Sequence, residues 1–331
     1  MRILQVAIQA QGGGAEKVAL TLHQQFSKNH QSRIVYMYPD LPLEGSNQEN
    51  LNIPRLKIIG IPLGIFRLLR ISRNFKPDIT LIHCEPAMLL SCLTPSLGEL
   101  FVVEHQPFHW KGIKGLVIHF SLKILRLRGC HTVNLRQSRA LASKSFYIPN
   151  PVEMVSASPI SDRQELPLSM IWIGRLSFDK GFDRLPKVTS KAKVEVIHIF
   201  GSGDMKDEVG FENTKCIYHG FDPQVWVNLP TNPLLLVTSR WEGDGLVILE
   251  ALVRCIPILI IEFADIQELP IPKSSICRDE VEMAKKISDI ESGALDVASL
   301  VNLEARLMIE KLRSPKEIAQ KYLDTFAKVL E

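Results

Sequence analysis

The sequence predicts an α/β protein with two doubly wound domains in tandem, each built on a parallel sheet. Short apolar runs of strand character alternate with runs of helical apolar spacing along the chain, which is typical of parallel sheets covered by helices. The length of 331 residues, of which 46% are hydrophobic, is enough for two domains with separate cores. Pro149 and Pro151 stiffen the segment 148–152 and cannot continue a helix, so we expect the domains to be linked there.

The first domain, residues 1–150, opens with an apolar strand at 2–8. A glycine turn at 12–14 and a helix at 15–27 follow this strand. Val18, Leu22 and Phe26 recur at helical spacing, which predicts that one face of the helix packs on the sheet. Further strands are predicted at 33–38, 55–59, 78–83 and 101–104, with a polar loop at 44–50 and a basic helix at 65–75.

The second domain, residues 151–314, repeats this alternation. Strands are predicted at 169–173, 193–200, 216–219, 234–237 and 257–261, and helices at 246–254 and 280–287; a further helix at 315–330 follows the domain. The strand at 234–237 is apolar at every position, as expected for a strand buried on both faces. No repeat of fixed period is present, so a solenoid is not expected.

Charge is divided unevenly between the two halves of the chain. Residues 1–150 hold 18 lysines and arginines against 8 acidic residues, a net charge of +10, whereas residues 151–331 hold 21 against 28, a net charge of −7. This asymmetry predicts that only the first domain meets an anionic partner. Nucleic acid, a phosphorylated substrate and an anionic membrane surface are the candidates.

Two basic segments favour the membrane among these candidates. The stretch 111–139 contains seven lysines and arginines and no acidic residue, and its apolar residues recur at helical spacing; a second basic cluster spans 67–76. Basic amphipathic helices bind anionic membrane surfaces, but a solvated face over an ordinary core explains the pattern nearly as well. Nucleic acid is disfavoured because no helix-turn-helix, zinc-finger or RNA-binding signature accompanies the charge.

Cysteine usage and hydropathy indicate the compartment. The six cysteines include no CxxC pair, which argues against a disulfide framework or a zinc site and favours free thiols in a reducing environment. No stretch of the sequence reaches about 18 uninterrupted apolar residues, so a membrane-spanning helix is not expected. The first residues resemble a strand more than a signal peptide, so we expect a cytoplasmic protein.

Three segments carry residues suited to an anionic ligand. The turn 12–14 follows a strand and opens a helix, so its backbone amides can approach a phosphate, although a simple tight turn fits equally well. Arg175 and Lys180 lie in a loop after a strand and could converge on a diphosphate; a solvated loop is the alternative. Neither glycine run matches a P-loop or a dinucleotide fingerprint, which disfavours a Rossmann dehydrogenase.

The third segment places two carboxylates eight positions apart. Glu242 lies in a glycine-containing turn, and Glu250 lies on the following helix among apolar residues. A carboxylate in such a setting is costly unless it is hydrogen-bonded. Binding of the two hydroxyls of a ribose would satisfy Glu250, and so would pairing with a structural arginine or amide.

Together these segments resemble the retaining glycosyltransferases of family GT4 (glycosyl transferases group 1), of the bacterial surface-polysaccharide type. The matching segments occur in family order: GGGAEKVAL (12–20), PDITLIH (77–83), VVEHQP (102–107), IPNPVE (148–153), GRLSFDKGFDRL (174–185), FGSGD (200–204) and TSRWEGDGLVILEAL (238–252). The resemblance implies the GT-B fold, in which two Rossmann-like domains face each other across a cleft. It also implies that the helix at 315–331 crosses back to the N-terminal, acceptor-binding domain.

The resemblance implies a role for each matching residue. Seven would bind the donor: Gly13, Gly14, Arg175, Lys180, Gly201, Gly203 and Glu250. Two would be catalytic, namely His105, which would contact the transferring sugar, and Glu242, which would face it. His83 matches a common strand-end histidine, and we interpret it as structural. A cation pair and a helix start can neutralise a departing diphosphate, so we expect neither a metal nor a cofactor.

The implied function is transfer of a hexose or N-acetylhexosamine from a nucleotide diphosphate sugar, with a UDP-sugar as the expected donor. The acceptor would be lipid-linked or part of lipopolysaccharide, O-antigen or capsule, at the inner face of the cell membrane. A UDP-sugar 2-epimerase of the same fold and a non-catalytic partner subunit are the alternatives. The sequence departs from the family at Asp244, where an aromatic residue is usual, at Cys255, where glycine is usual, and at 262–272, where a Gly-Gly-x-x-Glu segment is expected.

Overall fold

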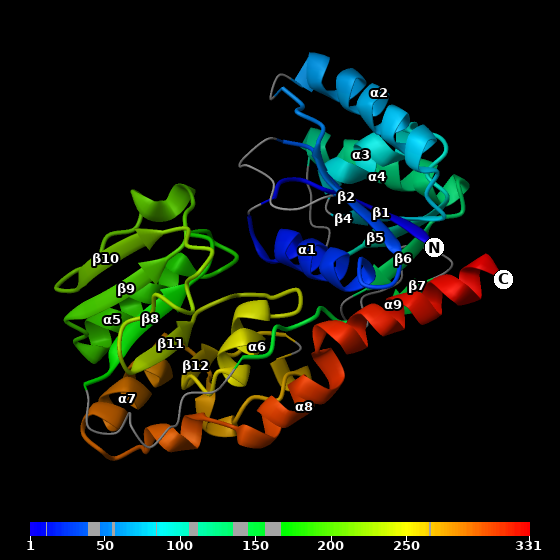
Figure 1. Ribbon diagram of the computed structural model, residues 1–331. Coiled ribbons are helices and arrows are strands. Elements are labelled where there is room, and N and C mark those ends of the chain that lie inside the picture. The colour runs from blue at the N-terminus through cyan, green and yellow to red at the C-terminus, as the bar shows by residue number, and fades with distance from the viewer. Residues whose placement is uncertain are drawn as a thin grey trace. The chain divides into compact units, whose positions relative to one another are not determined.

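The computed structural model describes residues 1–10, 12–38, 47–54, 57–83, 85–105, 112–134, 145–155, 167–264 and 266–331. The chain divides into two compact units (Figure 1). One is formed by Met1–Pro151 together with Arg313–Glu331, and the other by Val152–Leu312. Each unit contains a parallel sheet with helices on both faces.

The first unit is built on a seven-stranded sheet with the order β3-β2-β1-β4-β5-β6-β7 among the described residues. Its strands are β1 (Arg2–Ala7), β2 (Gln31–Tyr36), β3 (Gln48–Asn50), β4 (Ile79–His83), β5 (Glu99–Val103), β6 (His131–Asn134) and β7 (Ser145–Tyr147). All neighbouring strands are parallel. The chain moves outward from β1 to β3 and then resumes at β4 on the other side of β1, so a topological switch point lies between β1 and β4.

Helices cover both faces of this sheet (Figure 1). They are α1 (Gly14–Phe26), α2 (Lys57–Phe75), α3 (Glu85–Leu93), α4 (Gly112–Leu127) and α9 (Pro315–Leu330). Apolar residues of α2, α3 and α4 form one buried core with Val102 and its neighbours in the sheet. On the opposite face, the Phe326 ring of α9 lies 5.0 Å from Phe101 of β5 and 6.0 Å from Phe26 of α1. Side chains alternate between the faces of a strand, so α1 and α9 cover the face that α2–α4 leave open.

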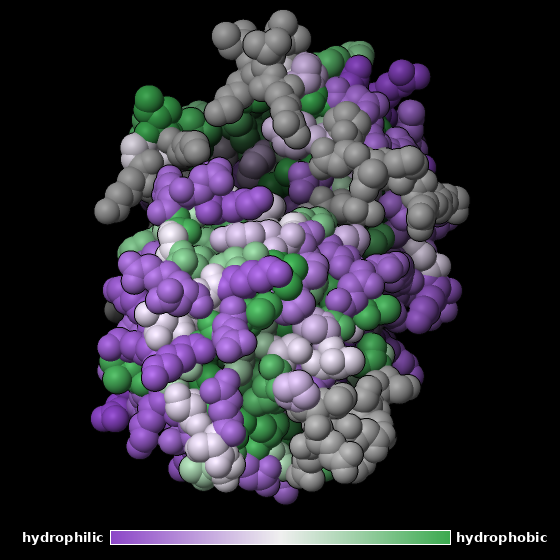
Figure 2. Space-filling model, turned by 90° about the vertical axis from the view of Figure 1, so that its left-hand side faces the viewer, coloured by the Kyte–Doolittle hydropathy of each residue, from purple (hydrophilic) through white to green (hydrophobic). Residues whose placement is uncertain are grey.

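The second unit is built on a parallel sheet with the order β10-β9-β8-β11-β12-β13. Its strands are β8 (Ser169–Ile173), β9 (Val196–Phe200), β10 (Lys215–Gly220), β11 (Pro233–Val237), β12 (Ile258–Ile261) and β13 (Ile276–Cys277). α5 (Leu185–Ala192) and α7 (Glu280–Glu291) complete a core on one face, and α6 (Leu246–Val253) and α8 (Leu303–Arg313) complete another. On the side of the molecule shown in Figure 2, hydrophilic side chains alternate with smaller hydrophobic patches.

The predicted strand at 55–59 is wrong where the structure describes it, because Lys57, Ile58 and Ile59 form the first turn of α2. Residues 55–56 lie outside the described part of the chain. Short apolar runs do not distinguish a strand from a buried helix, and Gly60 lowers the local helix propensity. Gly60 is required for packing instead, since a Cβ there would lie 2.5 Å from the Pro54 carbonyl oxygen. The predicted polar loop at 44–50 ends in the short edge strand β3, whose three polar residues carry no apolar signal.

Candidate functional site

The carboxyl-terminal edge of the second sheet brings two of the predicted motifs together. β8 and β11 are hydrogen-bonded neighbours, although β9 and β10 separate them in the sequence. The loop 174–181 follows β8 and the loop 238–245 follows β11, so both leave the sheet at its switch point, where open α/β sheets bind ligands. Arg175, which is exposed, and Lys180 therefore lie on the same edge as Glu242.

Backbone packing at Gly181 fixes these two loops against each other. Gly181 has a φ of 64°, and a Cβ there would lie 1.9 Å from the Thr238 carbonyl oxygen. The Thr238 hydroxyl donates to the Gly181 carbonyl oxygen at 2.8 Å and accepts from the Trp172 indole N–H at 3.1 Å. Lys180, the preceding residue, is thereby held in a defined position relative to the β11 loop.

Gly201 and Gly203 support the loop that carries Arg175. A Cβ on Gly201 would lie 1.8 Å from the Gly174 carbonyl oxygen, and a Cβ on Gly203 would lie 2.4 Å from the Leu176 carbonyl oxygen. The backbone after β9 can approach the backbone after β8 this closely only because both residues lack a side chain. Their contact with a nucleotide remains a prediction.

An ion pair joins the two motifs at this edge. Lys180 Nζ lies 2.7 Å from Glu242 Oε2, and the Ser239 hydroxyl donates to Glu242 Oε1 at 2.7 Å. Only 26% of the Lys180 side chain and 11% of the Glu242 side chain are exposed, so the pair is largely shielded from solvent. The predicted diphosphate-binding cation and the predicted sugar-facing carboxylate therefore neutralise each other, and an incoming anion has to compete with Glu242 for Lys180.

Glu250 is buried on α6 and is held by a tryptophan. Its Oε2 accepts a hydrogen bond from the Trp226 indole N–H at 3.0 Å, and 7% of the residue is exposed. Arg254 donates to the Glu250 main-chain oxygen at 2.9 Å, and its guanidinium carbon lies 4.9 Å from the centroid of a Trp226 ring. The protein therefore provides one hydrogen-bond donor to this carboxylate itself. The alternative of a structural partner for Glu250 expected an arginine or an amide, and the structure has an indole instead. Ribose binding remains a prediction.

Sequence reasoning missed a second ion pair beside the first. Arg240 binds both carboxylate oxygens of Asp183, at 2.7 and 2.8 Å, and its guanidinium carbon lies 3.6 Å from the Phe178 ring centroid. The hydrogen bond from Arg240 holds the pKa of Asp183 below its ordinary value. Asp183 and Arg240 are 57 positions apart, so only the fold reveals this pair. Ser239, by contrast, is three positions from Glu242 and could have been found from the motif.

In the first unit, the glycine turn lies after β1 at the start of α1. Gly13 is the N-cap residue and provides no capping side chain, so the amides of the first helical turn need other partners. A Cβ on Gly12 would lie 2.7 Å from Gln9 Nε2 and 2.9 Å from Glu16 Cδ, whereas a Cβ on Gly13 would make only an ordinary contact at 3.8 Å. A side chain at Gly12 would therefore displace the ends of the Gln9 and Glu16 side chains, and anion binding at Gly13 and Gly14 remains a prediction.

Two histidines and a glutamine, from two neighbouring strands and the loop after the next strand, lie close together. His83, the last residue of β4, has its Nδ1 2.9 Å from His105 Nε2 and its Nε2 2.9 Å from Gln5 Oε1. The two imidazole rings stack with centroids 5.2 Å apart. His83 is fully buried, and the Nδ1 atom of His105 is buried without a hydrogen-bond partner among the described residues. His83, which the sequence led us to interpret as structural, is therefore in direct contact with the predicted catalytic His105.

Both rings are neutral at pH 7. Burial lowers the pKa of His105 to about 4, and burial together with the neighbouring His105 lowers the pKa of His83 well below its usual value. Burial disfavours the charged form of an imidazole because the ion loses its hydration. The candidate site of the first unit is therefore polar but uncharged at these positions.

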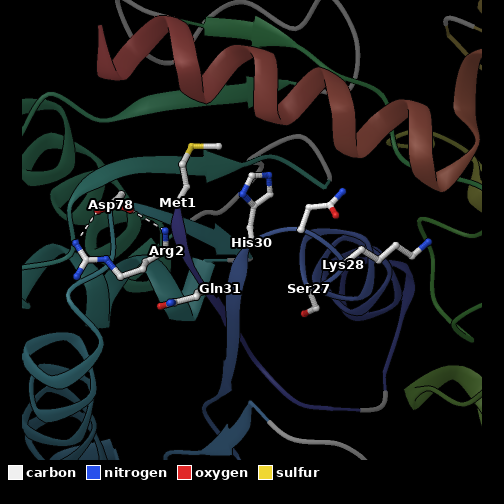
Figure 3. A pocket seen from close by; sticks show the side chains of 8 residues that line it. Met1, Arg2, Ser27, Lys28, His30, Gln31 and Asp78 are labelled. Carbon is white, nitrogen blue, oxygen red and sulfur yellow. Dashed lines mark hydrogen bonds and ion pairs between the residues drawn. The ribbon is translucent and has the colours of Figure 1, made fainter.

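A hollow in the first unit lies away from these residues (Figure 3). Its volume is about 640 Å³, and Arg2, Lys28, His30 and Asp78 contribute to its lining. Arg2 and Asp78 form an ion pair at 2.8 Å and lie next to each other in its lining (Figure 3). These residues lie at the amino-terminal ends of the parallel strands, opposite the carboxyl-terminal edge at which α/β sheets bind ligands, so we do not assign the active site there.

The described part of the chain contains neither a cluster of metal-binding side chains nor a membrane-spanning helix. No group of three or more histidine, cysteine, aspartate or glutamate side chains is arranged to hold a metal ion there. Likewise, no helix built from the described residues is long and apolar enough to cross a bilayer.

Comparison with solved structures establishes the fold of the whole chain. Anabaena HepE in complex with UDP is 18% identical, with a TM-score of 0.70 over 99% of this chain and 100% of that chain. Sucrose-phosphate synthase from Thermosynechococcus elongatus is 15% identical with a TM-score of 0.75, over 99% of both chains. The lipopolysaccharide outer core galactosyltransferase WaaB is 16% identical with a TM-score of 0.64, over 99% of this chain and 100% of that chain. The chain has the GT-B fold that the sequence predicted.

Comparisons by sequence match a smaller part of the chain than the comparisons with solved structures. No protein-family model matches the chain. It is 29% identical over 129 residues to an uncharacterised 41.2 kDa protein in the cps region of Klebsiella pneumoniae. That match covers 36% of this chain and spans about a third, 34%, of the relative.

Proposed function

We propose that the chain is a retaining glycosyltransferase of the GT4 type that transfers a hexose or N-acetylhexosamine from a UDP-sugar. The observation that carries this proposal is the meeting of the Arg175–Lys180 loop with the Glu242 loop at the switch point of a GT-B sheet. The fold provides the usual place for a nucleotide, and the loops provide cations for its phosphates. HepE, which has the same fold, was crystallised with UDP and with UDP-glucose.

The leaving group determines what the second unit has to do. When the bond between the sugar C1 atom and the diphosphate breaks, negative charge develops on the diphosphate and positive charge on C1. Arg175 and Lys180 would stabilise the departing diphosphate, because cations placed where charge develops lower the barrier to bond cleavage. Lys180 is the better placed to respond, since it exchanges Glu242 for phosphate as the donor binds.

The remaining site residues would orient the donor. Glu250 would accept hydrogen bonds from ribose hydroxyls, and Glu242, once Lys180 has moved to the phosphates, would face the transferring sugar. His105 would contact that sugar from the first unit, and Gly13 and Gly14 would offer backbone amides to it or to the phosphates. The new bond forms between C1 and an acceptor hydroxyl with retention of configuration. The residues themselves supply the charge that this chemistry needs, so we propose a reaction without a metal or other cofactor.

The proposed acceptor is a lipid-linked or polysaccharide-assembly intermediate. Two similarities support it: WaaB is a lipopolysaccharide outer core galactosyltransferase, and the Klebsiella relative is encoded in a cps region. Neither is similar enough to transfer its acceptor to this chain directly. The acceptor is therefore the part of the function that needs a direct assay.

We also propose a cytoplasmic protein that binds the inner face of the membrane through α4. Ile113, Leu116, Phe120 and Leu127 of this helix are 83%, 72%, 58% and 81% exposed, which is unusual for large apolar side chains on one helix. Lys123 and Arg126 of α4 are also exposed. Apolar residues beside cations suit the interface of an anionic bilayer.

A donor assay tests the proposed activity. The protein is incubated with UDP-glucose, UDP-galactose and UDP-N-acetylglucosamine, with and without a lipid-linked acceptor, and UDP and the sugar product are measured. We expect UDP release that depends on Arg175 and a product with the anomeric configuration of the donor. Interconversion of the UDP-sugar at C2 without UDP release would instead identify an epimerase, and no turnover of any donor would support a non-catalytic subunit.

A flotation assay with anionic vesicles tests the membrane proposal. The double variant Lys123→Gln/Arg126→Gln should release the protein, since each cation near the surface contributes about 1 kcal/mol. Arg128 is left intact because it donates to the Ser91 main-chain oxygen at 2.6 Å and stabilises the end of α3. The matched control, Lys316→Gln/Lys328→Gln on α9, removes the same charge elsewhere in the unit and should remain bound. Equal release of both variants would indicate that only net charge matters.

A further inference from the structure

The chain Gln5–His83–His105 fixes how His105 meets its ligand. Gln5 lies on β1, His83 ends β4 and His105 follows β5 by two positions, so three neighbouring strands contribute one member each. Both links are 2.9 Å long, within the range of a good hydrogen bond. The second link ends at His105 Nε2, and the other ring nitrogen of His105, the buried Nδ1 atom, has no hydrogen-bond partner among the described residues.

The direction of the hydrogen bonds follows from the first member. The Gln5 carbonyl oxygen faces His83, so His83 Nε2 must carry the proton and donate it. A neutral imidazole carries one N–H, which leaves His83 Nδ1 as an acceptor. His105 Nε2 must therefore donate to His83 Nδ1, and His105 Nδ1 is left without a proton, with its lone pair free to accept a hydrogen bond.

We propose that Gln5 and His83 are positioning residues that hold His105 as its Nε2–H tautomer, so that His105 Nδ1 accepts a hydrogen bond from a hydroxyl group of the sugar. The sugar part of this inference rests on the proposed function, whereas the tautomer does not. A ring nitrogen with a lone pair attracts a donor and repels an anion. The site of the first unit thus selects hydroxyl groups at this position and leaves the phosphates to other residues.

The opposite direction is the competing arrangement. The Gln5 amide nitrogen has no hydrogen-bond partner among the described residues. Turning the Gln5 amide over would let this nitrogen donate to His83 Nε2, and both histidines would then carry their proton on Nδ1. His105 would present an N–H to the ligand and would favour an oxygen acceptor such as a phosphate. The two arrangements differ in the orientation of the Gln5 amide and in the proton positions on both imidazole rings, and spectroscopy can measure those proton positions.

Nitrogen NMR on ¹⁵N-histidine-labelled full-length protein decides between them. Long-range ¹H–¹⁵N correlations give the tautomer of each neutral ring, and the variants His83→Phe and His105→Asn assign the two sets of signals. We expect both rings in the Nε2–H form at pH 7.5. An Nδ1–H form of His105 in the unaltered protein would overturn the proposal, whether or not any variant folds.

Removal of the first member tests whether Gln5 sets the tautomer. In Gln5→Leu, His83 Nε2 loses its acceptor, so the His83 proton should move to Nδ1 and donate to His105, which reverses the tautomer of His105. Ser32→Ala is the control: it removes the partner 2.9 Å from Nδ1 of the buried His23 in the same unit and should leave His105 unchanged. A His105 tautomer unaffected by Gln5→Leu would also overturn the proposal.

Kinetics tests the consequence for transfer. With saturating UDP-sugar, Gln5→Leu should lower kcat by about tenfold, similar to the smallest loss seen when the hydrogen-bond partner that orients a metal-ligating histidine is removed. The Kd for UDP alone should be unchanged, because UDP lacks the sugar hydroxyl. If the unaltered protein transfers no sugar, the proposed function fails, while the NMR result still decides the tautomer. An unchanged kcat in Gln5→Leu with a reversed tautomer would show that His105 does not contact the sugar in this way.

Discussion

The two candidate sites of this protein lie at equivalent places in their sheets, but one is built from charged side chains and the other from neutral ones. In the second unit, the switch point carries Lys180 and Glu242 as an ion pair, with the exposed Arg175 in the same loop as Lys180. In the first unit, the switch point and the adjacent strand end carry His83 and His105, both neutral and linked by hydrogen bonds. Each sheet reverses its strand order at the place where its site is built.

This difference matches the two parts of a nucleotide sugar. A diphosphate needs cations that can move onto it, and an ion pair that is partly shielded but not sealed provides one. A sugar ring is uncharged and needs hydrogen bonds of fixed direction, which a buried network of neutral groups provides. Under the proposed function, the division of charge between the sites is therefore also a division of labour.

The largest effect should come from the cations of the second unit. Arg175→Ala and Lys180→Ala should each lower the rate of sugar transfer by about 10²–10³, since each removes a charge that stabilises the leaving diphosphate. Steady-state rates at saturating acceptor measure this, with circular dichroism as the control for folding. Near-normal turnover of both variants would show that the loop 174–181 is a solvated surface loop and does not bind the diphosphate.

The two glutamates should separate nucleotide binding from transfer. Glu250→Gln should weaken UDP binding by about tenfold, because a neutral amide is a poorer partner for ribose hydroxyls than a carboxylate. Glu242→Gln should slow transfer while UDP binding is kept or becomes tighter, since Lys180 is released from its ion pair. Calorimetric titration with UDP measures both. Equal losses of UDP affinity in the two variants would contradict this separation.

Glycine substitutions should show how rigidly the charged site is supported. Gly201→Ala should lower the free energy of unfolding by about 3 kcal/mol, because its Cβ would meet a carbonyl oxygen at 1.8 Å and the backbone must shift. The control is Gly220→Ala, which also has a positive φ but nothing within 4 Å of the new Cβ, and should cost only about 1–2 kcal/mol. Urea denaturation compares them, and equal losses would mean that the close approach is relieved without cost.

The neutral site should make the first unit sensitive to acid. The folded pKa of His105 is about 4, below its unfolded value of 6.5, so the unfolded state binds the extra proton as the pH falls. The contribution of His105 to the free energy of unfolding is therefore fully present above about pH 6.5 and is lost on acidification. The loss should be about 2 kcal/mol between pH 6.5 and pH 5. Urea unfolding at pH 7.5 and pH 5 should show a smaller pH dependence in His105→Asn. An unchanged pH dependence would contradict a His105 ring that stays neutral in the folded protein.

The sequence predicted β8 of the second unit and α9 of the first unit at the residues where the structure has them. A mostly apolar run in the one case and a proline-started amphipathic segment in the other leave little ambiguity. α3 was missed, since its apolar residues surround the helix and give no amphipathic period. The strand predicted at 55–59 was wrong at 57–59, the part of it that the structure describes, because the sequence does not reveal that Gly60 is needed for helix packing.

Motif reasoning found individual site residues but not their partners. Lys180 and Glu242 were each named, yet their ion pair spans 62 positions and depends on β8 lying next to β11. Likewise, nothing in the sequence of the first strand marks Gln5 as a site residue, and only its distance of 2.9 Å from His83 indicates a role. Long-range pairing of this kind follows from strand order, which periodicity alone does not determine.

Titration of UDP into three proteins tests the division of labour most directly: the unaltered chain, Lys180→Ala and His105→Asn. Lys180→Ala should raise the Kd for UDP by about tenfold or more, because a cation–phosphate contact is lost. His105→Asn should leave this Kd within about twofold, since the proposed partner of His105 is a sugar hydroxyl that UDP lacks. A His105→Asn variant that loses UDP affinity as severely as Lys180→Ala would show that the phosphates and the sugar are not bound by separate residues in this way.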